Sequence, residues 1–327
     1  MQKITTIEAH TAGEPLRVIT SGYPEIPGDT ILQRRAYARE HLDHLRRMLM
    51  LEPRGHADMY GAILTPPATS DGDVGVLFLH NEGYSTMCGH GIIAIVKVGL
   101  EHGLFEASPD AIRIDTPAGR VLAAANIENG KVVDVSFRNV PSFVFRDLRV
   151  AVDGLGDVAC TIAFGGAFYA YVDAEPLGLT LTPEHSHRLI DRGMAIKHAV
   201  AASTELRHPT GADDLNFLYG TIFVAPQPGA HSRNVCIFAE GEVDRSPTGT
   251  GVSGRAAIHH ARGELGSDWI TIESILGTSF DVRVAATVDV GGTPAIVPEV
   301  RGQAHVTGRS EFWLEPDDPL GDGFLIR

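Results

Sequence analysis

An internal repeat limits the folds that this chain can adopt. The segment "VLFLHNEGYSTMCGHGIIAIVKVGLEHG" has a counterpart 160 residues later, "VCIFAEGEVDRSPTGTGVSGRAAIHHARG". Three sets of positions align between the two halves: Phe78 with Phe238, 89–91 with 249–251, and 112–119 with 270–277. Each half therefore predicts a strand, a tight turn, a glycine-rich helix start, a helix, and then a further strand and hairpin.

Short β-branched runs separated by turns surround both predicted helices, for example "KVVDVSFRNVPSFVF", "ACTIAFGGAFYAYVDA" and "SFDVRVAATVDVGG". This pattern predicts an α+β fold of two pseudo-symmetric domains, each a mixed β-sheet or barrel around one central helix. A chain of 327 residues exceeds the roughly 250–300 residues at which single cores tend to split. We predict domains at 1–152 and 153–310, with the link near "AVDGLGDVA" (151–159).

The stretch "STMCGHG" places Cys88 directly before a predicted helix, between glycines. A helix start leaves unpaired N–H groups and a positive local field, which makes a thiol there easier to ionise. The alternative is a small buried side chain beside a glycine turn, because free cysteine is among the most buried residue types. Cys160 and Cys236 lie in apolar, strand-like runs and are expected to be inert core residues.

Charge and composition exclude several partners. A net charge of −14 disfavours nucleic acid and anionic membranes, because both require basic patches. The N-terminus "MQKITTIEAHTAGEP" lacks the apolar core of a signal peptide, and no apolar run approaches the roughly 18 residues of a membrane span. The three cysteines form no C-x-x-C pair, which fits a reducing compartment. We therefore expect a cytoplasmic protein.

Neither a metal nor an organic cofactor is expected. His185 and His187 are two positions apart and diverge on a helix. His41 and His44 share a face of "RRAYAREHLDHLRRML", a predicted amphipathic helix whose polar side is most simply solvated. Lys97 follows Cys88 on its helix, but no phosphate-binding loop accompanies it as a Schiff-base site would require.

Four motifs resemble those of the proline racemase family: "HTAGEP" (10–15), "MCGHG" (87–91), "GGAFYA" (165–170) and "DRSPTGTG" (244–251). They stand in the family's order, and the similarity covers nearly the whole chain. The resemblance implies a fold like that of diaminopimelate epimerase and cofactor-independent chemistry at the α-carbon of an imino acid. It also implies that a C-terminal strand within 311–327 returns to the first domain, and a homodimer is expected.

The family's racemases and epimerases carry a second cysteine in "SPCGTG", where this chain has Thr248 in "SPTGTG". A threonine hydroxyl is a far weaker acid than a thiol, and no adjacent base is evident to activate it. The Cys88 and Thr248 pair resembles the trans-3-hydroxy-L-proline dehydratases of the family. In that substrate the hydroxyl and the α-hydrogen share one ring face, so Cys88 alone could serve a syn elimination that gives Δ1-pyrroline-2-carboxylate.

The resemblance assigns further roles. Gly89, His90, Gly249 and Thr250 would line the carboxylate end of the substrate, and Asp244 would receive its ring ammonium.

Structural alternatives exist for these positions: Asp244 could cap the following turn, His90 could face solvent, and Thr248 could be a helix cap. Two rival functions also stay open. One is a proline racemase or hydroxyproline epimerase, and the other is a catalytically silent imino-acid-binding protein.

Overall fold

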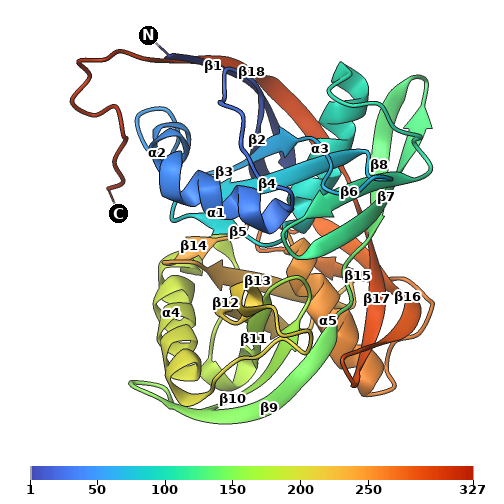
Figure 1. Cartoon of the computed structure of the whole chain (residues 1–327). Coiled ribbons are helices and arrows are strands. Elements are labelled where there is room, and N and C mark those ends of the chain that lie inside the picture. Colours follow the sequence, from blue (N-terminus) through green and yellow to red (C-terminus); the bar gives the residue numbers. More distant parts are fainter. Residues whose placement is uncertain (1, 327) are drawn as a thin grey trace. The chain divides into compact units, whose positions relative to one another are not determined.

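The structure is a computed structural model that describes residues 2–326. Contacts divide it into two compact units. Unit 1 comprises Met1–Phe137 with Gln303–Arg327, and unit 2 comprises Arg138–Gly302. Each unit is mainly sheet and contains one central helix, α3 in unit 1 and α5 in unit 2 (Figure 1).

The elements of unit 1 are β1 (Gln2–Thr11), β2 (Glu14–Ser21), α1 (Ile31–His41), α2 (Asp43–Met50), β3 (Tyr60–Thr65), β4 (Val74–His80), β5 (Tyr84–Ser85), α3 (Gly89–His102), β6 (Ile112–Thr116), β7 (Gly119–Glu128), β8 (Lys131–Arg138) and β18 (Ala304–Leu314). Those of unit 2 are β9 (Phe143–Val152), β10 (Gly156–Phe164), β11 (Phe168–Asp173), α4 (Ser186–Ser203), β12 (Leu218–Ala225), β13 (Ser232–Phe238), β14 (Glu242–Val243), α5 (Gly249–Ala261), β15 (Ile270–Glu273), β16 (Ser279–Val290) and β17 (Thr293–Gly302). Three short 3-10 turns also occur in unit 2: η1 (Glu175–Leu177), η2 (Pro183–His185) and η3 (Asp213–Leu215).

The two units share one strand order. In unit 1 the paired strands run β18-β1-β2-β3-β4-β6-β7, and in unit 2 they run β9-β10-β11-β12-β13-β15-β16. The sense of each pairing also matches: the third and fifth pairs are parallel and the others antiparallel in both units. The predicted duplication and the predicted α+β fold are therefore confirmed.

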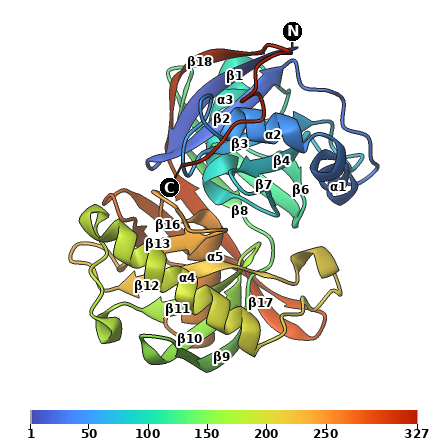
Figure 2. The ribbon, with the colours of Figure 1, turned by 90° about the vertical axis from the view of Figure 1, so that its left-hand side faces the viewer.

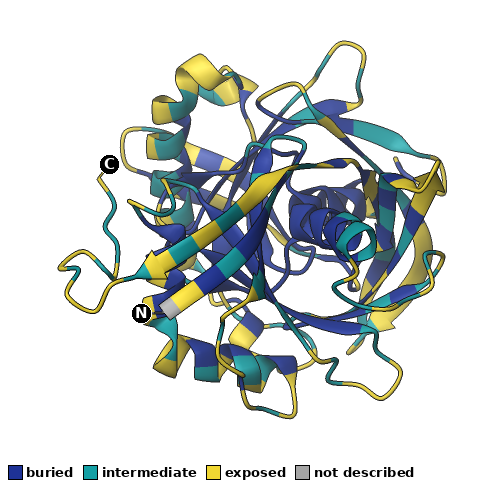
Figure 3. Cartoon of the chain, turned by 90° about the horizontal axis from the view of Figure 1, so that it is seen from above, coloured by how far each residue is buried: buried dark blue, intermediate teal, exposed yellow. Residues whose placement is uncertain are grey.

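The central helices are buried mainly because most of their residues are apolar or small. In α3, ten of the fourteen residues are buried, among them Ile92, Ile93 and Ile95 with no exposed surface. Full burial of each such side chain contributes about 1.5–3 kcal/mol. In α5, eleven of thirteen residues are buried. Figure 2 shows α3 near β1 and β2 of its unit, and Figure 3 shows exposed residues gathered mainly on loops and outer surfaces.

Outer helices cover the sheets on the side away from the central helix. In unit 1, α1 and α2 contact β4, and in unit 2, α4 contacts β12 and β13. The single helix predicted around 34–49 is wrong, because the chain breaks at Leu42, whose ψ of 12° and φ of −124° are not helical. His41 therefore ends α1 while His44 belongs to α2, so the two histidines do not share a helical face.

The unit boundaries differ from the predicted ones at 152/153 and 310/311. The stretch 151–159, expected to link the domains, is the turn of a hairpin inside unit 2, where Val152 of β9 pairs with Gly156 of β10. At the other end, β18 begins at Ala304 and pairs with β1 along its length, with Gln2 opposite Leu314. Among the described residues no helix is long and apolar enough to cross a membrane.

Candidate active site

Cys88 is the N-cap residue of α3, with φ −146° and ψ 106°. Its Sγ accepts a hydrogen bond from the backbone N–H of Gly91 at 3.2 Å, so the sulfur replaces the oxygen of an ordinary cap. The side chain is only 4% exposed. Both the N–H contact and the positive end of the helix dipole stabilise a thiolate at this position.

His90 lies directly against this sulfur. Its Nδ1 is 3.2 Å and its Nε2 is 3.6 Å from Cys88 Sγ. The ring is 4% exposed and meets the ring of Tyr60 edge-on at 4.8 Å. The alternative of a solvent-facing turn residue is therefore wrong. With its proton on Nδ1, His90 donates to the sulfur, and it can exchange a proton with the thiol.

Two sets of contacts explain the shape of the turn around this helix start. A Cβ on Gly91 would lie 2.8 Å from Cys88 Sγ and 2.9 Å from the ring of Phe78, so only glycine fits. Thr11, in the "HTAGEP" turn between β1 and β2, donates its hydroxyl to the carbonyl of His90 at 2.8 Å. The hairpin turn thus fixes the backbone that carries the His90 side chain.

Thr248 holds the corresponding N-cap position of α5 in unit 2, but its side chain makes no cap hydrogen bond. Its φ of 68° lies in the left-handed region, which a β-branched residue rarely adopts. The hydroxyl Oγ1 is buried and forms no hydrogen bond of normal geometry within residues 2–326, although it lies close enough to Asp244 to favour the charged form of that carboxyl. The alternative of a capping threonine is therefore wrong, and a polar atom is left available to a ligand.

Asp244 begins the turn that leads to Thr248. Its Oδ1 accepts from the backbone N–H of Ser246 at 2.8 Å, so the carboxylate does cap this turn. Ser246 in turn accepts from the Thr248 N–H at 3.1 Å. Burial raises the pKa of Asp244 to about 6, although the neighbouring Ser246 and Thr248 oppose the shift. The carboxylate is thus a desolvated anion that a cation would stabilise.

Gly249 and Thr250 form the first turn of α5 and are buried. Thr250 Oγ1 is 2.8 Å from the hydroxyl of Tyr169, which belongs to the "GGAFYA" turn and strand. A Cβ on Gly165 would lie 2.1 Å from the Thr250 carbonyl oxygen, so this turn approaches α5 as closely as backbone allows. The hairpin turn of unit 2 therefore supports the second residue of its helix, as Thr11 does in unit 1.

The structure brings Cys88, Gly89 and His90 together at the start of α3, and it brings Asp244, Thr248, Gly249 and Thr250 together at the start of α5. Sequence reasoning missed the supporting residues Thr11, Tyr169 and Ser246. The motifs "HTAGEP" and "GGAFYA" were a usable signal for the first two, because both are glycine turns between strands. No motif distinguishes Ser246 from an ordinary turn serine.

The other candidates do not join these groups. Lys97 bonds Glu101 at 2.9 Å and the Val132 carbonyl at 2.6 Å, which gives it a structural role. Cys160 and Cys236 are buried in β10 and β13, as predicted. Within the described part of the chain, no group of three or more histidine, cysteine or acidic side chains is arranged to hold a metal ion.

These features define a duplicated two-domain α+β protein with a thiol at one of two matched helix starts. The chain belongs to the proline racemase family, whose model matches residues 6–325. It is 52% identical to a protein of Colwellia psychrerythraea named trans-3-hydroxy-L-proline dehydratase, over 99% of this chain and 93% of that one. It is 46% identical to a 3-hydroxyproline 2-epimerase of Burkholderia multivorans, over 100% and 99% of the two chains.

A solved structure extends the likeness to three dimensions. A hydroxyproline epimerase from Agrobacterium vitis, crystallised with trans-4-hydroxy-L-proline, superposes with a TM-score of 0.94 at 31% sequence identity. The match covers 100% of this chain and 95% of that chain. The expected family fold is confirmed.

Proposed function

We propose that this protein is a hydro-lyase that dehydrates trans-3-hydroxy-L-proline to Δ1-pyrroline-2-carboxylate. The observation that carries the proposal is the difference between the two helix starts. One presents the Cys88 thiol beside an imidazole, and the other presents Thr248 with an unbonded hydroxyl. Relatives that carry the dehydratase name, among them the one at 52% identity, support the same reaction.

Cys88 is the proposed general base. Its thiolate would take the α-hydrogen of the substrate, and the electron pair of that C–H bond would form the new C=C bond as the 3-hydroxyl leaves. The leaving oxygen must gain a proton to depart as water. Both groups lie on the same face of the ring, so the Cys88 thiol formed in the first step, or His90 beside it, can supply that proton. The enamine product then tautomerises to the cyclic imine.

Substrate binding is assigned to the remaining residues of the two starts. N–H groups of Gly89, Gly249 and Thr250 would hold the carboxylate together with His90, because helix starts favour anions. Asp244 would pair with the ring ammonium, which offsets the desolvation of its buried carboxylate. Such a site needs no net positive charge on the protein, which is consistent with the net charge of −14.

Thr248 is proposed as a contact to the ring or its carboxylate rather than as an acid. Its hydroxyl is a much weaker acid than a thiol, so protonation of the opposite face should be slow. The weak acidity of Thr248 favours a dehydratase over an epimerase. The relative from Burkholderia multivorans, at 46% identity, would otherwise favour an epimerase. An epimerase would need a water or Thr248 itself as the second acid.

A single experiment separates the candidate functions. The purified protein is incubated in heavy water with trans-3-hydroxy-L-proline, trans-4-hydroxy-L-proline and L-proline in turn, and cyclic imine and chirality are measured. We expect imine from the 3-hydroxy substrate and no inversion of the other two. Rapid inversion without imine would establish an epimerase instead, and the absence of both would leave an imino-acid-binding protein.

The working state of the enzyme is also proposed. The elimination consists of proton transfers and one C–O cleavage, so it requires neither a metal nor pyridoxal phosphate. We further propose a cytoplasmic homodimer whose partners are its imino acid and its second copy. Light scattering of the purified protein tests the dimer.

A further inference from the structure

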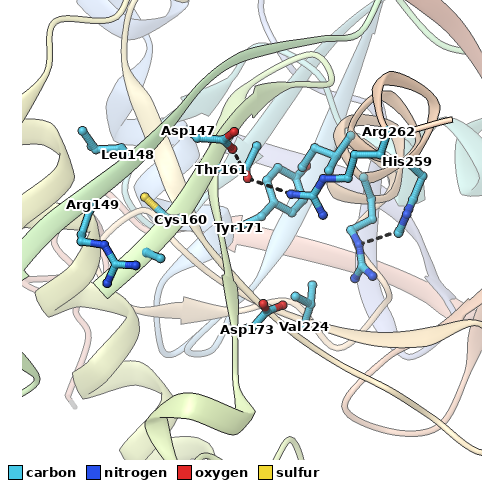
Figure 4. A pocket seen from close by; sticks show the side chains of 13 residues that line it. Asp147, Leu148, Arg149, Cys160, Thr161, Tyr171, Asp173, Val224, His259 and Arg262 are labelled. Carbon is cyan, nitrogen blue, oxygen red and sulfur yellow. Dashed lines mark hydrogen bonds between the residues drawn. The ribbon is translucent and has the colours of Figure 1, made fainter. Parts of the chain in front are cut away.

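A pocket of about 470 Å³ lies within unit 2, at the opposite end of α5 from Thr248 (Figure 4). Its walls come from β9, β10, the end of β11 and the C-terminal half of α5. At about 1.5 Å per helical residue, Arg255 and Arg262 lie roughly 10 Å and 20 Å along the axis from Thr248. No residue assigned to the proposed active site lines this pocket.

Arg255 is a buried cation in this wall, with 8% of its surface exposed. Its Nη1 donates to the Asn234 side-chain oxygen at 2.8 Å, and its Nε donates to His259 Nε2 at 3.2 Å. Both partners are neutral, because burial lowers the pKa of His259 and asparagine does not titrate. Among residues 2–326 no carboxylate lies within ion-pair distance of Arg255. A buried charge without a counter-ion is costly, and a bound anion would offset that cost.

His259 holds the guanidinium in position. Its Nδ1 is 2.6 Å from a Glu264 carboxylate oxygen, so the ring proton resides on Nδ1 and Nε2 is left to accept from Arg255. Arg255 therefore donates hydrogen bonds to the protein through Nε and Nη1, and its Nη2 can donate to a ligand in the pocket. The hydrogen bonds from Glu264 to His259 and from His259 to Arg255 hold the Arg255 guanidinium in place, but they do not neutralise its charge.

A second cation faces the same space. Arg262 donates through Nη2 to Thr161 at 3.3 Å and forms no ion pair with any described residue. Burial is the main cause of the lowered pKa of Arg255, and the like charge of Arg262 adds to that shift. Two cations that converge on one cavity, one of them buried, indicate a site for an anionic oxygen group.

Two carboxylates, Asp147 and Asp173, and a third arginine, Arg149, also line the pocket. Asp147 accepts from Thr161 at 2.6 Å, and the same hydroxyl accepts from Arg262 (Figure 4). Asp173, at the end of β11, is exposed. The Asp173 side chain makes no hydrogen bond or ion pair within the described chain. Burial lowers the pKa of Arg255, and the negative charge of Asp173 opposes that shift. The unpartnered Asp173 would repel a simple anion, whereas a molecule with both charges can place its anionic group on the arginines and its cationic group on this carboxylate.

We propose that this pocket binds a small zwitterion of the amino-acid class, with its carboxylate on Arg255 and Arg262 and its ammonium on Asp173. The site is distinct from the proposed active site and does not depend on that assignment. It binds without reacting. Burial raises the pKa of the Cys160 thiol to about 11 and raises that of the Tyr171 hydroxyl further, so neither is a nucleophile at neutral pH.

Ligand-observed NMR titration of the full-length protein tests the site with four probes: L-alanine, propionate, ethylammonium and inorganic phosphate. L-Alanine carries both charges, propionate and ethylammonium one each, and phosphate tests for a simple oxyanion site. The variants Arg262→Gln and Asp173→Asn change side chains that are exposed to solvent. Arg188→Gln, on the exposed side of α4, is the matched control, and Asp244→Asn reports binding at the proposed active site.

We expect L-alanine to bind the wild type at least tenfold more tightly than propionate or ethylammonium. Arg262→Gln and Asp173→Asn should each weaken L-alanine binding about tenfold, and Arg188→Gln and Asp244→Asn should leave it unchanged. The proposal is overturned if L-alanine does not bind, or if only Asp244→Asn weakens it. If only Arg262→Gln weakens L-alanine binding, the site binds a plain anion and not a zwitterion. The same conclusion holds if Asp173→Asn strengthens phosphate binding.

Discussion

Replacing Asp244 by asparagine should stabilise unit 2 at neutral pH and weaken substrate binding at the same time. Burial raises the pKa of Asp244 from an ordinary 3.8 to about 6 in the folded protein. The folded carboxyl therefore binds its proton more tightly than the unfolded one. The contribution of this carboxyl to the unfolding free energy of the wild type is therefore fully present below about pH 4, and it is lost as the pH rises through about 6.

The size of the effect follows from that difference. A pKa difference of about 2 corresponds to roughly 3 kcal/mol of unfolding free energy, at ~1.36 kcal/mol for each pH unit. Asparagine keeps an oxygen that can accept from the Ser246 N–H, but its NH₂ group must also be desolvated. We therefore expect Asp244→Asn to be more stable than wild type by about 1–3 kcal/mol at pH 7.5 and no more stable at pH 4.5.

Tryptophan fluorescence can follow unit 2 alone in urea. Trp269 lies in unit 2, 4.6 Å from Arg283 and 4.8 Å from Arg301, whereas Trp313 of β18 is 52% exposed in unit 1. A Trp313→Phe background leaves Trp269 as the reporter, since the chain has two tryptophans. Asp157→Asn, an exposed acid of β10, is the control and should show no pH-dependent change.

One outcome refutes the reasoning. If Asp244→Asn lowers the free energy of unfolding equally at pH 4.5 and pH 7.5, the native carboxylate is not destabilised by burial, and its contribution is the turn cap alone. The same variant should raise KM for trans-3-hydroxy-L-proline at least tenfold. An unchanged KM with the expected gain in stability would show that the ring ammonium binds elsewhere.

In the wild type, kcat/KM should fall about tenfold between pH 7 and pH 5, because the ionised fraction of an acid with a pKa of about 6 falls from roughly 0.9 to 0.1; a flat profile in a stopped assay would contradict this. Cys88→Ser should abolish imine formation and leave the melting temperature within a few degrees, because a hydroxyl cannot serve as the base; near-normal turnover would exclude Cys88. Thr248→Cys should give some D-proline from L-proline in heavy water, as judged by chiral chromatography, since it places a thiol at the second start; a folded, ligand-binding variant without inversion would show that position 248 is not directed at the α-carbon. Gly165→Ala should destabilise unit 2 by roughly 1–3 kcal/mol in urea, because its Cβ would lie 2.1 Å from a backbone oxygen; Gly266→Ala, with open space around it, should be near neutral.

The duplicated core could be predicted because its signals are local. The aligned glycines at 89–91 and 249–251 indicate both helix starts. Gly103 and Gly263 follow the two helices with φ values of 64° and 74°, the left-handed conformation that commonly ends a helix. The unit boundary could not be predicted in the same way. The strand that β9 supplies in unit 2 is supplied in unit 1 by β18, from the far end of the chain. Pairing across some 300 residues leaves no periodic trace in the sequence.

The residues of the candidate site could be named from the sequence, but their interactions could not. The contact of His90 with Cys88 depends on a side-chain rotamer, and the support of His90 by Thr11 joins segments 79 residues apart. The pocket of Arg255 and Arg262 was missed for another reason. Arg255 lies in the middle of α5 and Arg262 directly after its end. Arginine is an ordinary residue at both kinds of position, because it forms helices readily and is favoured near helix C-termini. Only the burial of Arg255 without a carboxylate distinguishes it.

The two helix starts differ in backbone as well as in side chain. Cys88 has an extended φ of −146° and bonds its own helix through sulfur. Thr248 instead holds a φ of 68°, a conformation that costs a β-branched residue of order 1–3 kcal/mol. A threonine whose only task was to cap α5 would adopt the extended conformation and bond the helix. Three features of Thr248 have one explanation if a ligand is the partner of its hydroxyl. They are the strained backbone, the bond from its N–H to the Ser246 oxygen, and the unbonded hydroxyl itself. The conformation of Thr248 therefore supports its proposed role as a substrate contact and not merely as a helix cap.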